Sequence, residues 1–259
     1  MQSTKHILLV LLTLFSLNAC SSNPGSYTVM TYNIRHGVGL DRVLDLDRIV
    51  RVIKSVDPDI IVLNEVDHGT LRSFSVQQTD SLGRSLGMQT IFGRSIDYDG
   101  GEYGNALLTK YPVIQFRVID LSVDSLREGR SVFLSSIDLG QDTLVIMGTH
   151  LGLSPEERYQ QVERIIQNLP DSKNLILAGD LNFEPESDTY RLISDHLVDG
   201  VQAVDSDTEY TFPADKPDSR IDYIFISTGI NPLRLPIITV EDLTIASDHR
   251  PQILEFVIR

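Results

Sequence analysis

Cysteine, tryptophan and positive charge are scarce in this 259-residue chain. The single cysteine, Cys20, lies near the N-terminus, so the rest of the chain can form neither an internal disulfide nor a thiolate metal site. Tryptophan is absent, and 22 Lys and Arg stand against 36 Asp and Glu, which gives a net charge of −14 at pH 7. Overall charge therefore does not favour binding to a polyanion such as DNA, although a local basic patch is not excluded.

The chain also lacks an apolar run long enough to span a membrane at its N-terminus. Lys5 precedes an apolar segment at residues 7–17, which has the length of a signal peptide. Leu17-Asn18-Ala19-Cys20 follows and resembles a bacterial lipobox, which implies cleavage before Cys20 and a lipid on its thiol. A plain signal peptide with an incidental cysteine is the alternative. We expect a signal peptide at residues 1–19, a tether at 20–26 and a single folded domain at 27–259, attached to the bacterial cell envelope through Cys20.

The most informative stretch is an apolar run at residues 174–179 that ends in Asp180-Leu181-Asn182. Side chains two residues apart on a strand point to the same face, so this strand delivers a carboxylate and a carboxamide together. In α/β sheets, ligands bind at such carboxyl ends. An ordinary turn uses the same residue types, so this ending does not decide the matter by itself.

The same arrangement occurs twice along the chain. Residues 26–65 and residues 142–180 each read as strand, polar tip, helix, strand and acidic tip. We interpret the two stretches as equivalent β-α-β units that face each other and bring four strand tips to one site. The four tips carry Asn33, Glu65, His150 and Asp180.

Two more stretches near the C-terminus contribute polar groups. A predicted strand at residues 221–226 begins with Asp222, and Asp248 and His249 precede a last strand at 252–258. A strand is also expected at 237–240, and a long polar loop at 205–220. Because candidate residues run from position 33 to 249 and no linker divides them, we expect one domain.

These groups suit metal-assisted hydrolysis. Carboxylate and carboxamide oxygens with no sulfur partner are the ligands of Mg²⁺ or Mn²⁺ rather than Zn²⁺. Such an ion polarises a phosphoryl oxygen, while an imidazole and a carboxylate handle protons, which together can hydrolyse phosphate esters. Asp222 could orient His249, but an acid at a strand start is also a common cap.

Seven motifs, taken in order, resemble the endonuclease/exonuclease/phosphatase superfamily. They are Thr-Tyr-Asn-Ile-Arg, Asn-Glu-Val-Asp, Gly-Glu-Tyr-Gly-Asn-Ala, Gly-Thr-His-Leu, Gly-Asp-Leu-Asn-Phe-Glu-Pro, Ile-Asp-Tyr-Ile-Phe and Ser-Asp-His-Arg-Pro. The resemblance covers residues 27–258. It implies a four-layer α/β sandwich, in which two packed mixed sheets are flanked by helices, and a metal-dependent phosphoric ester hydrolase like deoxyribonuclease I or neutral sphingomyelinase.

The resemblance implies that one set of residues binds the metal and the phosphate. Glu65 corresponds to the principal Mg²⁺ ligand, with help from Asn33 and Asp248. Asn182 would hold a phosphate oxygen, and Asn105 would line the phosphate pocket.

A second set is implied to carry protons and charge. Asp180 would orient or deprotonate the attacking water. His249, paired with Asp222, would stabilise the pentacovalent phosphate or act as the base, and the sequence leaves open which of Asp180 and His249 is the base. His150 matches a histidine of the deoxyribonuclease I and sphingomyelinase branches, and Glu102 matches the acid that orients it.

Substrate choice is less well indicated. Arg35, beside Asn33, is the best candidate for contact with a substrate phosphate, and His36 is either a neighbour of the site or an ordinary loop residue. We expect a monomeric Mg²⁺- or Mn²⁺-dependent phosphodiesterase of the cell envelope. The alternatives are a secreted nuclease, a phosphomonoesterase and a catalytically silent binding protein.

Overall fold

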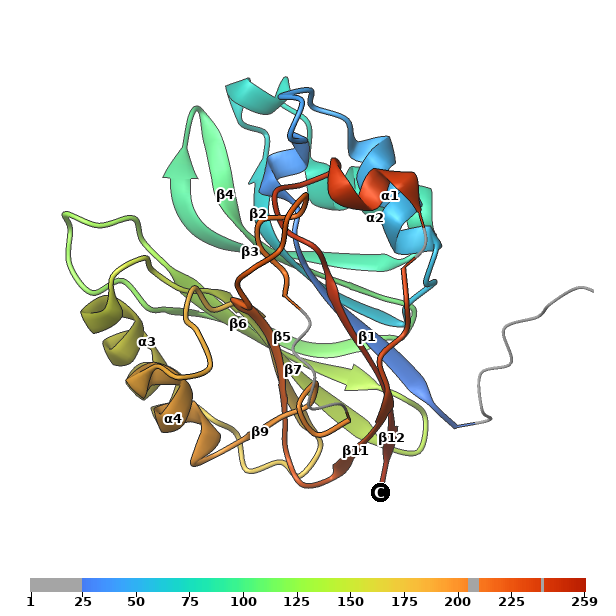
Figure 1. The fold of residues 1–259 in the computed structure, drawn as a ribbon, viewed down its shortest axis with the longest axis vertical. Coiled ribbons are helices and arrows are strands. Elements are labelled where there is room, and N and C mark those ends of the chain that lie inside the picture. Colours follow the sequence, from blue (N-terminus) through green and yellow to red (C-terminus); the bar gives the residue numbers. More distant parts are fainter. Residues whose placement is uncertain (1–24, 205–209, 239) are drawn as a thin grey trace, which may run out of the picture.

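The computed structural model describes residues 25–204, 210–238 and 240–259, in which two six-stranded sheets pack face to face (Figure 1). The predicted signal peptide and Cys20 lie outside the described residues. Within the described ranges, none of the helices has the length and apolar composition needed to cross a bilayer.

The first sheet has the strand order β11-β12-β1-β2-β4-β3. Its strands are β1 (Tyr27–Asn33), β2 (Ile60–His68), β3 (Gln89–Tyr98), β4 (Gly101–Thr109), β11 (Ile230–Arg234) and β12 (Gln252–Ile258). Helices α1 (Leu46–Lys54) and α2 (Gln78–Leu86) cover its outer face (Figure 1). Three short 3-10 turns, η1 (Arg35–Gly37), η2 (Leu71–Ser73) and η3 (Glu241–Thr244), lie in its connections.

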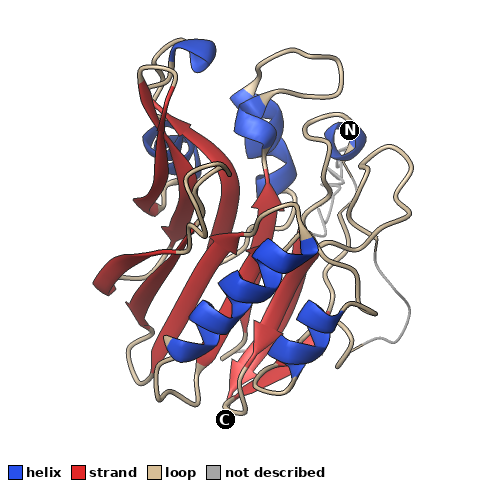
Figure 2. Cartoon of the chain, turned by 90° about the vertical axis from the view of Figure 1, so that its left-hand side faces the viewer, coloured by secondary structure: helices blue, strands red, loops and turns tan. Residues whose placement is uncertain are grey.

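The second sheet has the order β5-β6-β7-β8-β10-β9. Its strands are β5 (Val113–Asp120), β6 (Ser131–Asp138), β7 (Thr143–His150), β8 (Leu175–Asp180), β9 (Val198–Asp199) and β10 (Asp222–Ile226). Helices α3 (Pro155–Gln167) and α4 (Asp188–Ser194) lie across its outer face (Figure 2).

Strand alternation explains how one chain builds three apolar layers. On β1, Val29 belongs to the cluster between the sheets, whereas its neighbour Met30 belongs to the cluster beneath α1 and α2. Strands buried on both faces must be apolar at successive positions, which is the pattern of the runs at 60–63 and 175–178. The predicted four-layer sandwich is therefore confirmed.

The predicted internal repeat is also confirmed. β1 pairs with β2 in parallel across α1, and β7 pairs with β8 in parallel across α3. Asn33 lies opposite Asn64 in the first pair, and His150 lies opposite Asp180 in the second. Parallel pairing brings the carboxyl ends of both strands to one edge, so each unit presents two polar tips there.

Helix starts follow from capping. Asp45 accepts hydrogen bonds from the backbone N–H groups of Asp47 and Arg48 at the start of α1. Ser154 caps α3, whose first residue is Pro155, as the sequence indicates.

The expected strand at residues 237–240 is wrong. Residues 237, 238 and 240 are irregular, residue 239 lies outside the described residues, and the edge of the first sheet is formed by β11. Pro236 lacks an N–H group, so the ladder that β11 forms with β12 cannot continue through it.

Candidate active site

Glu65 reaches the site through a break in the β2 ladder. Pairing between β2 and β4 shifts register between Leu63 and Val66, which is a β-bulge, and Glu65 has a left-handed φ of 57°. A bulge bends its strand and redirects a side chain. The sequence places an acid at this tip, but the bulge is what turns it towards the other sheet.

Gly179 allows β8 to approach β7 closely. A Cβ atom at this position would lie 1.8 Å from the Thr149 carbonyl oxygen, and Gly179 has a φ of 151°. Only glycine fits here without moving the strands apart. Asp180 and His150 are thereby held side by side at the two tips.

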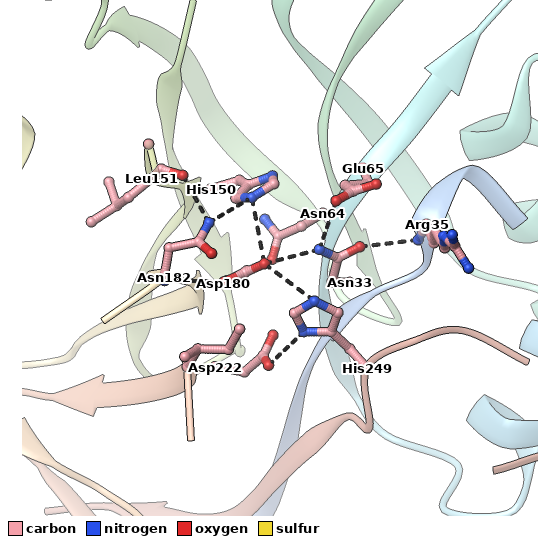
Figure 3. A network of polar contacts seen from close by, with 12 residues as sticks. Asn33, Arg35, Asn64, Glu65, His150, Leu151, Asp180, Asn182, Asp222 and His249 are labelled. Atoms are coloured by element: carbon pink, nitrogen blue, oxygen red, sulfur yellow. Dashed lines mark hydrogen bonds and ion pairs between the residues drawn. The ribbon is translucent and has the colours of Figure 1, made fainter. Parts of the chain in front are cut away.

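The side chain of Asn33 joins the two sheets (Figure 3). Its amide nitrogen donates to Glu65 Oε1 at 3.0 Å and to Asp180 Oδ2 at 2.9 Å, and its oxygen accepts from the Arg35 N–H. The amide thus bridges two carboxylates of opposite sheets. In this arrangement its nitrogen, rather than the oxygen expected of a metal ligand, faces Glu65.

Asn64 makes a second tie between the sheets. Its nitrogen donates to Asn105 Oδ1 and to the Thr149 carbonyl oxygen, and its oxygen accepts from the Asp180 N–H at 2.9 Å. Asn105 in turn donates to the Ser131 carbonyl oxygen and is fully buried. Asn105 is not among the residues that line the pocket described below, so its expected place in a phosphate pocket stays a prediction.

His249 lies between two carboxylates (Figure 3). Its Nδ1 is 2.9 Å from Asp222 Oδ2, and its Nε2 is 3.6 Å from Asp180 Oδ2. Burial would lower the pKa of His249, but the charges of Asp222 and Asp180 outweigh it and raise the pKa to about 10. Burial also raises the pKa of Asp180 to about 7, and the charge of Asp222 adds to this effect.

His150 has different surroundings. Its Nε2 lies 3.0 Å from Asn182 Nδ2 and 3.4 Å from Asp180 Oδ2, while its Nδ1 lies 3.4 Å from Arg130 Nη1. Burial lowers the pKa of His150 well below its usual value, and the adjacent Arg130 charge lowers it further. His150 is therefore a neutral imidazole that packs against Asp180 and Asn182.

The predicted partnership between Glu102 and His150 is wrong. Glu102 is half-exposed on β4 and lies 3.4 Å from Arg94 on the neighbouring strand. It pairs across the ladder with Asp97 and His68, so its side chain belongs to the hairpin of β3 and β4. Arg130 takes the place next to His150 that the resemblance assigns to an acid.

Arg35 pairs with an acid of the site. Its Nε lies 3.2 Å from Asp248 Oδ2, and its side chain is about one-third exposed. Neither Arg35 nor Asp248 is among the residues that line the pocket described below. A contact of Arg35 with a substrate phosphate stays a prediction.

Two carboxylates fit a divalent cation. No Lys or Arg of the described residues forms an ion pair with Glu65, whose pKa is raised by burial, and His36 Nδ1 is 4.0 Å from its second oxygen. Glu65, whose pKa is also raised by the nearby charge of Asp248, offers oxygen ligands that suit Mg²⁺ or Mn²⁺, and Asp248 would share its carboxylate between such an ion and Arg35.

Asp180, Asp222 and His249 offer a second group of possible ligands. One ligand atom from each residue lies within 4.8 Å of the others. In the absence of a cation, the pKa of His249 is raised by the charges of Asp222 and Asp180, and a cation bound among these three residues would require the neutral imidazole. The described residues thus offer two places for a divalent cation, Glu65 with Asp248 and the group of Asp180, Asp222 and His249.

A pocket of about 540 Å³ opens over these groups. Its floor contains the strand-tip residues, and its walls carry two arginines, two tyrosines and several apolar side chains. The lining residues are Glu65, Arg72, Tyr98, Tyr103, Glu128, Arg130, His150, Leu153, Asp180, Asn182, Phe212, Ile221 and His249.

Comparison with known families decides the identity of this arrangement. Residues 30–249 match the model of the Endonuclease/Exonuclease/phosphatase family. The chain belongs to this family.

Relatives and solved structures agree with that assignment. YbhP of Escherichia coli is 28% identical over 242 residues, which cover 87% of this chain and 94% of YbhP. A solved endonuclease/exonuclease/phosphatase structure from Beutenbergia cavernae is 25% identical with a TM-score of 0.74, covering 90% of this chain and 72% of that one. A mannosyl-6-phosphatase of Bacteroides thetaiotaomicron shares the fold at 21% identity, with a TM-score of 0.69 and coverage of 90% and 100%. The family assignment identifies this chain as a hydrolase of phosphoester-type substrates.

Sequence reasoning missed two residues of this family site. Asn64 precedes Glu65 in the Asn-Glu-Val-Asp motif, of which only the glutamate is predicted to belong to the site. Arg130 immediately precedes β6, which is antiparallel to β7, so it lies beside the tip that carries His150. In an antiparallel pair, the start of one strand lies beside the end of the other. Inspecting the residues at the start of the strand next to β7 would therefore have identified Arg130.

Proposed function

We propose that this protein is a phosphodiesterase that depends on Mg²⁺ or Mn²⁺. The observation that carries the proposal is the contact of Asp180 with both histidines at the floor of the pocket, 3.4 Å from His150 and 3.6 Å from His249, next to the acidic pair Glu65 and Asp248. Membership of a family of phosphoester hydrolases supports the same reading.

His249 and Asp180 divide the proton chemistry. Because His249 lies between two carboxylates, it carries a proton and stabilises negative charge on the phosphoryl oxygens. Asp180 is then the group that accepts a proton from the attacking water. The water oxygen bonds to phosphorus, the ester P–O bond breaks, and the departing alkoxide takes a proton from solvent.

Other residues keep Asp180 in place. Asn33 and Asn64 bind its side chain and its backbone N–H, respectively. Asn182 donates its backbone N–H to Asp180 Oδ1, and its side-chain nitrogen lies 3.0 Å from His150 Nε2 and donates to the Leu151 carbonyl oxygen at 3.0 Å. Asn182 lines the pocket, and binding a phosphate oxygen would require its amide to exchange one of these partners. A cation held by Glu65 and Asp248 would supply charge to polarise the phosphoryl group.

The test compares hydrolysis of bis(p-nitrophenyl) phosphate with that of p-nitrophenyl phosphate, in Mg²⁺, Mn²⁺ or EDTA. We expect diester turnover that EDTA abolishes and that His249→Ala lowers by about 10² or more. His196→Ala, at an exposed histidine outside the pocket, is the matched control and should leave the rate unchanged. Faster turnover of the monoester would make the protein a phosphatase, and loss of metal dependence would contradict the proposal.

We further propose that the protein is exported and anchored by a lipid on Cys20. The basic start, the apolar segment and the Leu-Asn-Ala-Cys sequence support this. β1 begins at Tyr27 and ends in the site at Asn33, about 20 Å farther along the strand. A tether at the N-terminus would therefore leave the pocket at the end remote from the anchor, open to soluble substrates.

Cell fractionation of wild type and Cys20→Ser tests the anchor. We expect the wild type in the membrane fraction and Cys20→Ser in the soluble fraction, with equal specific activity. Equal distribution of the two proteins would contradict lipidation. Gel filtration of residues 25–259 should give a monomer.

A further inference from the structure

Arg130 is a buried cation that the proposed hydrolysis does not use. Its side chain lines the pocket but is only 6% exposed. Its Nη1 lies 2.5 Å from the Glu128 carboxylate and 3.4 Å from His150 Nδ1. Its Nε–H has no hydrogen-bond partner among the described residues. A buried guanidinium is costly unless an anion and hydrogen-bond acceptors satisfy it.

The counter-charge of Arg130 comes from a side chain that is half in water. Glu128 is 47% exposed and lies on the loop between β5 and β6. A carboxylate and a phosphate present similar pairs of oxygens to a guanidinium. Glu128 therefore occupies the position that a phosphate of a ligand would take, and it can swing into solvent when displaced.

Arg72 supplies a second cation to the same pocket. Asp67 binds its Nε and Nη2 at 2.8 and 2.7 Å, which fixes the guanidinium, and its Nη1 makes no hydrogen bond with the described residues. The guanidinium lies 4.4 Å from the centre of the Tyr98 ring and 5.4 Å from that of Tyr103. Both tyrosines line the pocket. Arg72, Tyr98, Tyr103 and Arg130 form what we call the cationic wall.

We propose that the cationic wall binds a second phosphate group of the substrate while the reacting phosphoester lies at Asp180 and His249. The substrates are then phosphoesters that carry another phosphate, and Glu128 is the placeholder that this phosphate displaces. The inference rests on the proposed function for the position of the reacting group. The pocket also contains the carboxylates of Glu65 and Asp180, so an additional anion is better accommodated beside the two arginines of the wall.

The test uses a pair of ligands that differ by one phosphate, fructose 6-phosphate and fructose 1,6-bisphosphate. Binding is measured by titration calorimetry with Ca²⁺ present, and as inhibition of bis(p-nitrophenyl) phosphate hydrolysis with Mg²⁺. We expect the wild type to bind the bisphosphate about 10-fold or more tightly than the monophosphate, the effect of a hydrogen bond between charged groups.

Three variants show which residues cause the preference for the bisphosphate over the monophosphate. Arg130→Gln should abolish this preference, and Glu128→Gln should increase it several-fold because the placeholder charge is gone. Arg117→Gln removes a positive charge from an exposed position on β5 and should leave it unchanged. Equal binding of both ligands to the wild type would overturn the proposal, and so would equal losses in Arg130→Gln and Arg117→Gln.

Two controls separate a loss of bisphosphate binding from a loss of folding or of turnover. Thermal unfolding shows whether Arg130→Gln folds, and if it does not, Glu128→Gln decides, because unchanged bisphosphate binding there overturns the placeholder role. Calorimetry requires no turnover. A bisphosphate preference that depends on Arg130 therefore supports the subsite even if the diester is not hydrolysed, in which case the proposed function fails by itself.

Discussion

The two histidines of the site touch the same carboxylate, and their pKa values are shifted in opposite directions. His249 lies between Asp222 and Asp180, and its pKa is raised to about 10. His150 also touches Asp180, but Arg130 stands on its other side, and its pKa is lowered. Both rings are almost fully buried, so burial does not distinguish them. The neighbour on the far side of each ring decides its charge.

Because of this difference in pKa, we expect His249 and His150 to have different roles in the reaction. A charged histidine can stabilise negative charge on a phosphoryl oxygen, whereas a neutral histidine offers one hydrogen-bond donor and one acceptor without a positive charge. The five predictions below test that contrast, beginning with the largest expected effect.

His249→Gln should lower kcat/KM for bis(p-nitrophenyl) phosphate by about 10² to 10⁴, the range for loss of one acid–base group. Glutamine keeps a hydrogen-bond donor but cannot carry the charge. Initial rates in Mg²⁺ measure the effect. A loss smaller than about 10-fold would show that the charge of His249 is not used.

Asp222→Asn should lower the rate by about 10² and move the alkaline limb of the pH profile to lower pH. The charge of Asp222 is the largest of the contributions that raise the pKa of His249 to about 10, so its removal lets the imidazolium lose its proton at lower pH. The profile of kcat/KM between pH 6 and 11 measures the shift. Asp188→Asn, at an exposed acid on α4, should leave the profile unchanged. If the alkaline limb of the Asp222→Asn profile did not move, the charge of Asp222 would not be what raises the pKa of His249.

His150→Gln should lower kcat/KM by about 10-fold, the effect of one lost hydrogen bond near a charge. Because the pKa of His150 is lowered well below its usual value by burial and by the charge of Arg130, we expect the pH profile above pH 6.5 to keep its shape. A changed acid limb in this variant would mean that His150 does ionise during turnover.

Stability should depend on pH with opposite signs for the two residues. The raised pKa of His249 gives stability that is present below pH 6.5 and lost as pH rises through about 10. The lowered pKa of His150 causes a loss of stability as pH falls below 6.5, because the unfolded chain then takes up the proton. Each group contributes at most about 1.4 kcal/mol per pH unit.

Urea unfolding at a series of pH values measures these slopes. The deficit of His249→Gln relative to wild type should shrink between pH 7 and 10, and that of His150→Gln should shrink between pH 7 and 5. Parallel curves for both variants would show that the two histidines do not differ in charge.

Glu102→Gln should change kcat/KM by less than about twofold, since the side chain pairs with Arg94 on the β3–β4 hairpin. Initial rates of Glu102→Gln and His150→Gln, measured under the same conditions, provide the comparison. If Glu102→Gln matched His150→Gln in its loss, the assignment of Arg130 as the partner of His150 would be wrong.

The strand tips could be predicted because strand period and chain order are local properties. Asn33, Glu65, His150 and Asp180 each follow an apolar run, and parallel pairing across α1 and α3 brings them together. Asp222 and His249 join them as the motifs indicate, at 2.9 Å. These positions required no knowledge of long-range contacts beyond the β-α-β unit.

The site predictions that were not confirmed concern residues whose direction depends on a neighbouring strand. Glu102 and Asn105 are three positions apart on β4, yet one is half-exposed and the other is buried between the sheets. Arg35 follows Asn33 in a motif, but a left-handed φ of 46° directs it to Asp248. The resemblance could not foresee these directions, because they are set by local backbone geometry and by side chains distant in the sequence.

Strand period and residue type were sufficient for the polar strand endings and for the acidic, thiol-free chemistry of the site, since both are local properties of the chain. The four-layer fold was predicted only through the resemblance of the seven motifs to a known family. The packing of distant strands places Arg130 beside His150, and with it sets the direction in which the pKa of each histidine shifts. A pKa depends on charges a few ångströms away, and those charges come from strands far apart in the sequence.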